Sequence, residues 1–330
     1  MKLSIIGARV IDPSSGLDQV SDLHLEAGKI VAIGAAPAGF GPKPVLDTSA
    51  VAELILDRAR EAGNTKVFPI GALSKGLEGE QLAELVALRD AGCVAFGNGL
   101  ESFRNSRTLC RALEYAATFD LTVVFHSQDH DLAEGGLAHE GPTASFLGLP
   151  GIPETAETVA LARDLLLVEQ TGVRAHFSQL TSARGVALIA QAQARGLRVT
   201  ADVALYQLIL TDEALIDFSS LYHVQPPLRT RADRDGLREA VKSGVVSAIS
   251  SHHQPHERDA KLAPFGATEP GTAAAAGIDA GGRRPARPAD PARPSERRPG
   301  RRLAAASGQA RSGRRSGPGA VRSGHLHRGR

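Results

Sequence analysis

The stretch VRAHFSQLTSARGVALIAQAQARGLRVTADVAL, residues 173–205, decides the fold. Its two ends, 173–180 and 197–205, are short apolar runs with β-branched residues, which is typical of buried strands. The segment between them, 183–195, has the apolar period of a helix. A strand, a helix and a second strand in this order predict two parallel strands joined by a helical crossover.

The same alternation covers most of the chain. Helices are expected at 49–62, 78–91, 106–118, 153–171, 183–195 and 230–243, and strands within 66–73, 93–96, 121–127, 173–180, 197–205 and 245–250. A long loop is expected after the strand at 121–127, because it holds Gly135-Gly136 and Gly141-Pro142. Nearly all-apolar strands that alternate with helices predict an α/β protein with a parallel sheet.

The position of the polar residues distinguishes a barrel from a doubly wound sheet. No G-x-G-x-x-G or P-loop pattern follows the first strand, so nucleotide binding has no support. Polar residues instead follow several strands: Asn98; His126, Gln128 and Asp129; His176 and Gln179; and His252, His253 and His256. A barrel assembles its site from the ends of many strands. The sequence therefore predicts a TIM-type (β/α) barrel of the metal-dependent hydrolase kind, incomplete, with six of eight units.

The flanking segments differ from this barrel, which is expected at 44–270. Residues 1–40 are predicted to form a small β unit, a meander with a turn at 13–16 and Gly28 in a hairpin turn. Residues 271–330 hold 14 arginines and no lysine. A tail so poor in large apolar residues is expected to be disordered. Its arginine, glycine and proline content also fits a GC-rich gene read out of frame, and a third interpretation is nucleic-acid binding through arginine.

Composition limits the class of protein. The chain has 330 residues, is 42% hydrophobic and carries a formal net charge of +2, so it can bury one large core or two smaller ones. Cys93 and Cys110 are its two cysteines, which argues against a disulfide framework and favours a cytoplasmic protein. No signal peptide or membrane span is expected, and neither a membrane nor a nucleic acid is the expected partner.

Four segments carry a family resemblance. They are KPVLDTSAVAELILDRAREAG at 43–63, LTVVFHSQDHDL with GLAHEG at 121–141, the run from His176 to Glu213, and the run from His223 to Gly266. In order and spacing they resemble the dihydroorotase branch of the cyclic amidohydrolases. In active members of that family, histidines and carboxylates at strand ends hold zinc, a metal-bound water attacks a ring amide, and an aspartate after the last strand moves the proton.

The resemblance assigns a family position to each polar residue. His126 matches a metal ligand, whereas Gln179 falls on a ligand position and His176 on the non-ligand histidine of a His-x-x-His pattern. His252 falls on the catalytic aspartate, while His253 and His256 keep their places. The family's first His-x-His strand has no counterpart before Lys43, and Gly97-Asn98-Gly99 supplies no carboxylate.

A single matching ligand does not make a catalytic zinc site, which normally has three protein ligands and a water. The sequence therefore predicts no catalytic residue, no cofactor and no metal site. His126 and His176 are expected to be buried and hydrogen-bonded to neighbouring strand ends, and Asn98, Gln128 and Gln179 are expected to form a neutral network. A rearranged zinc site built from His126, His176, His252 and His253 stays open as an alternative.

Within the family, the pattern is most similar to non-catalytic dihydroorotase-like chains that accompany aspartate transcarbamoylase in some bacteria. This resemblance implies a structural subunit in pyrimidine biosynthesis, assembled with the transcarbamoylase catalytic subunit into a hetero-oligomer, a mixed dodecamer. An active zinc-dependent dihydroorotase with an altered ligand set is the alternative. Six strands leave sheet edges exposed, so either a partner covers them, or an internal deletion near Phe40–Lys43 and a frameshift near Gly271 have shortened and altered a longer chain.

Overall fold

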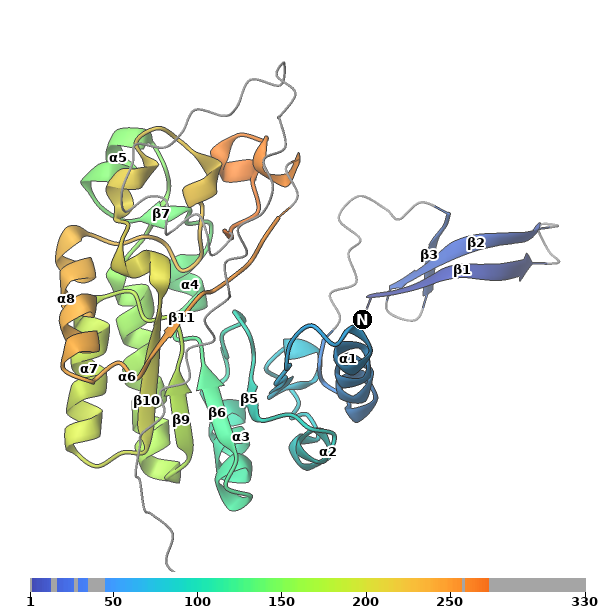
Figure 1. Ribbon diagram of the computed structural model, residues 1–330, viewed down its shortest axis with the longest axis horizontal. Coiled ribbons are helices and arrows are strands. Elements are labelled where there is room, and N and C mark those ends of the chain that lie inside the picture. The colour runs from blue at the N-terminus through green and yellow to red at the C-terminus, as the bar shows by residue number, and fades with distance from the viewer. Residues whose placement is uncertain (1, 13–16, 27–28, 35–44, 257–258, 273–330) are drawn as a thin grey trace, which may run out of the picture. The chain divides into compact units, whose positions relative to one another are not determined.

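The computed structural model describes residues 2–12, 17–26, 29–34, 45–256 and 259–272 (Figure 1). The chain divides into two compact units, Met1–Pro285 and Ala286–Arg330, and the second lies wholly outside the described residues. So does almost all of the expected tail, from residue 273 onward. The domain boundaries at 40, 44 and 270 remain predictions.

The N-terminal strands form a sheet of their own. They are β1 (Lys2–Asp12), β2 (Leu17–Glu26) and β3 (Lys29–Ile33), which pair antiparallel in the order β1-β2-β3. A buried histidine in β2 supports the end of this sheet, because a 2.8 Å hydrogen bond joins His24 Nε2 to the carbonyl of Gly34. The sheet is the meander that the sequence predicts, and its expected turns lie outside the described residues.

Within the described residues, the main sheet has six parallel strands: β4 (Ile70–Ala72), β5 (Ala95–Gly97), β6 (Thr122–Phe125), β9 (Arg174–Phe177), β10 (Val199–Ala204) and β11 (Ala248–Ser250). Their order in the sheet is their order in the chain, without the reversal that defines a doubly wound fold. Successive neighbours in one direction are what a (β/α) barrel requires. The prediction of a TIM-type barrel is therefore confirmed, and six of its strands lie in the described part of the chain.

Helices precede the first of these strands or connect one strand to the next, and they cover the sheet (Figure 1). They are α1 (Ser49–Ala62), α2 (Leu85–Asp90), α3 (Ser106–Thr118), α6 (Glu154–Thr171), α7 (Ala183–Ala194) and α8 (Arg231–Lys242). The main core lies between the sheet and the helices, where Leu113, Leu161, Phe177 and Ile189 are fully buried. Burying such side chains provides most of the favourable free energy of folding.

The helix predicted at 78–91 is wrong in its first half. Residues 78–84 are not helical, and α2 begins at Leu85. Gly76 and Gly79 take positive φ angles of 60° and 74°, which a helix does not allow. The chain then turns back, and Ala83 N–H donates to the carbonyl of Leu73 over 3.1 Å. The backbone bonds of Ala83 to Leu73 and of Lys75 to Gln81 thus outweigh the helical period of the segment.

The loop predicted after β6 contains regular elements instead. They are α4 (His130–Ala133), β7 (Ala138–His139), α5 (Pro142–Leu147) and β8 (Gly151–Ile152), and β7 pairs parallel with β8. The Gly-Pro pair that indicated a loop marks the start of α5, because proline is favoured in the first turn of a helix. With the short 3-10 segments at 212–215 and 265–267, these elements form a cap that has its own small core of Ala138, Ala144, Leu215 and Phe265.

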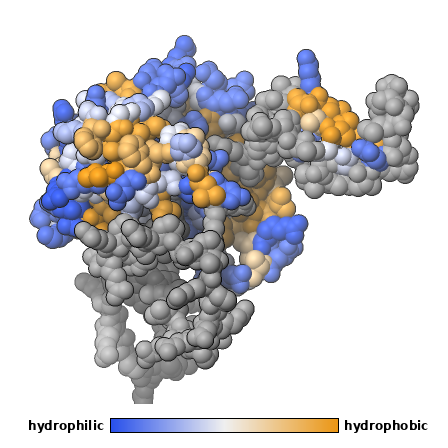
Figure 2. Space-filling model, turned by 90° about the horizontal axis from the view of Figure 1, so that it is seen from above, coloured by the Kyte–Doolittle hydropathy of each residue, from blue (hydrophilic) through white to orange (hydrophobic). Residues whose placement is uncertain are grey.

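The cap and the segments next to its 3-10 turns in the chain carry several large exposed apolar side chains. Phe146 is 82% exposed and Leu262 is 78% exposed, and Ile216, Phe218 and Leu221 are about half exposed. Seen from above, the molecule shows apolar residues gathered among hydrophilic ones on this side (Figure 2). None of the helices in the described ranges is both long and apolar enough to cross a membrane.

Candidate functional site

A cavity of about 450 Å³ lies at the end of the barrel where the parallel strands terminate. Four of the residues singled out from the sequence line it: His126, Gln179, His252 and His253. They come from three segments, after β6, β9 and β11, and the parallel direction of the strands brings them to one edge. Asn98, Gln128, Asp129 and His176 do not line this cavity.

His126 follows the last residue of β6 and is the most isolated polar side chain of the site. The residue as a whole keeps some exposure, but both ring nitrogens are shielded from solvent and neither has a hydrogen-bond partner. Burial, with a smaller contribution from His252, lowers the pKa of His126 to about 4. The imidazole is therefore neutral at physiological pH. The prediction that His126 bonds to a neighbouring strand end is wrong.

His252 follows β11 and is hydrogen-bonded through one of its two ring nitrogens. Its Nδ1 lies 2.6 Å from the hydroxyl of Tyr206, whereas its buried Nε2 has no partner. Burial lowers the pKa of His252, and the carboxylate of Asp202 opposes that shift in part. Burial also raises the pKa of Tyr206, so its phenol stays protonated and can donate to Nδ1.

Asp202, in the middle of β10, is the central carboxylate of the site, and the sequence reasoning missed it. It accepts hydrogen bonds from His176 Nε2 at 2.9 Å, Ser178 Oγ at 2.8 Å, Gln179 N at 3.1 Å and Ser250 Oγ at 3.0 Å. Burial by itself raises the pKa of Asp202, but these bonds outweigh it and the net shift is downward. An acidic residue inside the apolar run VTADVA was the signal that could have revealed it.

His176 has the structural role that the sequence predicts. Its Nδ1 lies 2.8 Å from Thr200 Oγ1 and its Nε2 bonds to Asp202, so both ring nitrogens are bound to β10. An imidazole held at both nitrogens is not available to a metal. The rearranged zinc site built from His126, His176, His252 and His253 is therefore not formed in this structure.

A neutral hydrogen-bond network is expected of Asn98, Gln128 and Gln179, and of these three the structure shows it at Asn98. Asn98 Oδ1 accepts from Ser74 N at 3.1 Å and Ser74 Oγ at 3.0 Å, and its Nδ2 donates to the carbonyl of Leu77. These bonds tie the segment after β5 to the segment after β4. By contrast, the buried Oε1 of Gln179 has no partner, so the network does not extend to this residue.

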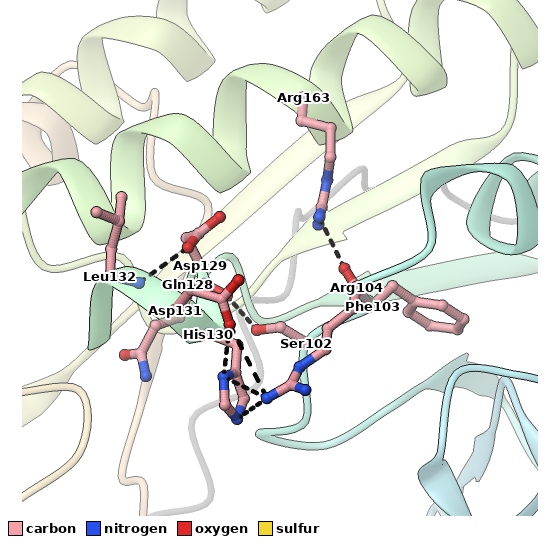
Figure 3. Close-up of polar contacts among 9 residues, drawn as sticks. All are labelled: Ser102, Phe103, Arg104, Gln128, Asp129, His130, Asp131, Leu132 and Arg163. Atoms are coloured by element: carbon pink, nitrogen blue, oxygen red, sulfur yellow. Dashed lines mark hydrogen bonds and ion pairs between the residues drawn. The ribbon is translucent and has the colours of Figure 1, made fainter. Parts of the chain in front are cut away.

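Gln128 and Asp129 are held by the loops around them (Figure 3). The hydroxyl of Ser102 donates to the backbone carbonyl of Gln128, and the carboxylate of Asp129 accepts from Leu132 N at 3.0 Å. Asp129 is thus the N-cap of α4. A carboxylate that caps a helix satisfies backbone donors, and this accounts for the acidic residue after β6 without a catalytic role.

The donors at the cavity do not fit the zinc site of an active hydrolase. They are the imidazoles of His126, His252 and the exposed His253, and the amide oxygen of Gln179. No three His, Cys, Asp or Glu side chains of the described residues come together as a possible metal site. A catalytic zinc normally takes three protein ligands, and the carboxylate of Asp202 is already bonded to four donors.

Comparison with known proteins places the chain in a family. A family model described as dihydro-orotase-like matches residues 19–184. A dihydroorotase-like protein of Pseudomonas putida is 69% identical over 325 residues, which cover 82% of this chain and 77% of that protein. The chain belongs to the dihydroorotase-like family.

More distant members and solved structures agree with the fold. A dihydroorotase of Syntrophobacter fumaroxidans is 44% identical over 239 residues, covering 72% of this chain and 54% of that protein. The solved L-hydantoinase of Arthrobacter aurescens, a dihydropyrimidinase, matches with a TM-score of 0.57 at 19% identity, covering 81% of this chain and 73% of that one. The dihydroorotase-like chain therefore has the amidohydrolase barrel fold, built here from six strands.

Proposed function

We propose that this dihydroorotase-like chain is non-catalytic and acts as a structural subunit of an aspartate transcarbamoylase complex in pyrimidine biosynthesis. The observation that carries the loss of catalysis is the neutral donor set at the cavity. His126 and His252 line it as imidazoles whose pKa values are lowered by burial. Neither supplies the negative charge with which a carboxylate would accept a proton.

The carboxylate nearby does not replace the missing base. Asp202 lies under the site, but its four hydrogen bonds lower its pKa. A base with a lowered pKa and filled acceptor positions is poor at taking a proton from water. Asp202 is therefore proposed to be a structural acceptor, which supports the proposed loss of catalysis.

Zinc analysis and an assay with dihydroorotate test the loss of catalysis. We expect the purified full chain to hold well under one zinc per chain and to hydrolyse dihydroorotate no faster than a buffer blank. Stoichiometric zinc together with turnover that is abolished in His126→Ala would contradict the proposal.

The partner is proposed from the family resemblance and from the cap. A cluster of exposed apolar side chains is typical of an interaction surface, and Phe146 is the most exposed of them. The tagged chain should therefore co-purify with the aspartate transcarbamoylase catalytic subunit from the same cells, and Phe146→Lys should weaken this association. Leu54→Lys, on α1 and 55% exposed, is the matched control. No association under mild conditions would argue against the proposed partner.

A second candidate is an active zinc-dependent dihydroorotase with an altered ligand set. One observation favours it: the unpartnered ring nitrogens of His126 and His252 belong to residues that line the same cavity. Imidazole nitrogens are good zinc ligands. If this candidate is correct, His126→Ala and His252→Ala should each reduce both zinc content and turnover.

A further inference from the structure

The cavity at the end of the barrel presents polar atoms that the described part of the chain leaves without partners. These atoms are both ring nitrogens of His126, Nε2 of His252 and Oε1 of Gln179, and all three residues line the cavity. A buried polar atom without a hydrogen bond costs free energy, so such atoms are rare and call for an explanation. Three unsatisfied side chains at one cavity point to a bound molecule that completes their hydrogen bonds.

The hydrogen-bonding roles of these side chains follow from their contacts. The protonated hydroxyl of Tyr206 lies 2.6 Å from Nδ1 of His252 and donates to it, so the neutral ring of His252 carries its hydrogen on Nε2. Oε1 of Gln179 can only accept, and the neutral ring of His126 has one nitrogen that donates and one that accepts. The cavity therefore offers two donors and two acceptors to a ligand.

The charges around the cavity favour an uncharged ligand. None of the described residues that line it is a lysine, an arginine, an aspartate or a glutamate. The nearby carboxylate of Asp202 accepts from Ser178 Oγ and Gln179 N, which belong to two lining residues. An anion would lose its water here, find no cationic side chain and face this carboxylate, whereas a cation would find that the carboxylate already has its donors.

The remaining lining is mostly apolar and limits the ligand further. A molecule covered with hydroxyl groups would bury many of them without partners. A compact ring with N–H and C=O groups on its edge places its polar atoms at the three side chains and its apolar faces elsewhere. The volume of about 450 Å³ is typical of small-molecule sites. The apolar lining side chains include Val45, Leu46, Ile70, Leu77, Leu100 and Val124.

We propose that the cavity binds an uncharged pyrimidine base, a ring with N–H donors and C=O acceptors and no carboxylate, and leaves it intact. His252 donates to a ring carbonyl and Gln179 accepts from a ring N–H, while His126 supplies the second donor and the second acceptor. This inference rests on the proposed loss of catalysis, because the ring is bound and not opened. It is independent of the proposed partner.

A matched pair of ligands tests the site. Uracil and orotate share one ring and differ by the carboxylate of orotate. In isothermal titration calorimetry of the full chain, with a chelator present, we expect one uracil to bind per chain and orotate to bind weaker by about tenfold or more. Uracil should also raise the unfolding temperature of the chain, because it binds only the folded state.

Variants of the chain locate the contact. Gln179→Ala removes the amide acceptor and should weaken uracil binding by about fivefold or more. Gln170→Ala, at an exposed position of α6, is the matched control and should bind uracil as the wild type does. Circular dichroism verifies that both variants fold.

Four results would overturn the proposal. They are no uracil binding by the folded wild type, equal affinities for uracil and orotate, unchanged binding in Gln179→Ala, and binding that requires zinc. Hydrolysis of dihydroorotate by the same sample is a separate result: it would contradict the proposed loss of catalysis, whereas failure to bind uracil without any hydrolysis would contradict this inference alone.

Discussion

The imidazole of His176 and the carboxylate of Asp202 lie on adjacent parallel strands and are joined by a hydrogen bond of 2.9 Å between Nε2 and Oδ2. Ser178 and Ser250 donate to the same carboxylate from the strands on either side. Asp202 therefore ties β9, β10 and β11 together at the end of the barrel that carries the cavity. Because β11 is an edge strand, this carboxylate is a major polar link that keeps it in register.

Replacing Asp202 should destabilise the barrel strongly. Asp202→Asn removes the charge and converts one acceptor into a donor, so buried donors lose their partner. Breaking a buried charged network typically costs about 3–5 kcal/mol, and we expect a loss of that order in urea unfolding. Asp90→Asn, at an exposed ion pair with Arg89, should change stability by less than about 1 kcal/mol. Equal effects of the two substitutions would contradict the role given to Asp202.

The buried ring of His126 should make stability depend on pH. Its pKa is about 4 in the folded chain and 6.5 in an ordinary environment, so the unfolded chain binds the proton more readily between these values. The free energy of unfolding should therefore fall as the pH drops from about 6.5 to 4, by roughly 3 kcal/mol from this residue. The lowered pKa of Asp202 also stabilises the folded chain, and this contribution is lost at lower pH, below the range from 6.5 to 4.

Comparison of the wild type with His126→Leu isolates this effect. Urea unfolding is followed at several pH values with a chelator present, so that no metal competes for the ring. The leucine variant should show a shallower fall between pH 6.5 and 4 and a higher stability at pH 7, because two unsatisfied buried nitrogens are removed. Parallel profiles of the two proteins would show that His126 is not buried as described.

A second buried carboxylate, Glu157 of α6, should be as sensitive as Asp202. Its oxygens accept from Thr181 N and Oγ1 at 2.8 and 2.6 Å and from Ser182 N and Oγ at 3.1 and 2.5 Å. Glu157→Gln places a donor against these donors and should cost about 2–4 kcal/mol. Glu169→Gln, on the same helix at an exposed pair with Arg195, should cost less than about 1 kcal/mol. Thermal unfolding of the two variants side by side checks this.

The barrel was predictable from sequence because its signal is local. Helix α1 spans the expected residues, 49–62, and Gly63 takes the left-handed C-cap conformation with φ of 64°. The segment 78–84 was misjudged because its conformation depends on backbone bonds to Leu73 and Lys75, which no periodicity reports. The cap elements after β6 were missed because short strands such as β7 exist only by pairing with β8.

The candidate site was predictable in its residues but not in its bonds. The position of His126, Gln179 and His252 at one cavity follows from parallel strands that end together. Which ring nitrogens are hydrogen-bonded does not follow from the sequence, because these bonds depend on contacts between strands. Thus His176 is fully bonded whereas His126 is not. Asp202 and Glu157 escaped notice because a buried acid can be recognised as structural only when its donors are known.

Gln179 combines two local costs that a single substitution can relieve. Its φ is 61°, in the left-handed region that disfavours residues with a Cβ, and its buried Oε1 has no partner. Its backbone N–H donates to Asp202, and any residue other than proline keeps that bond. Gln179→Gly should therefore raise the free energy of unfolding by about 1–2 kcal/mol.

Gln179→Ala separates the two costs. Alanine removes the unsatisfied amide but keeps the Cβ, so it should gain less than glycine, and the difference between the variants measures the backbone strain at this position. Urea unfolding at pH 7 reports both values. If glycine destabilises the chain while alanine stabilises it, the positive φ of Gln179 carries no cost. The unsatisfied amide alone then accounts for the gain in stability of the alanine variant. If both variants destabilise the chain, the amide makes a favourable contact in the cavity that outweighs its unsatisfied oxygen.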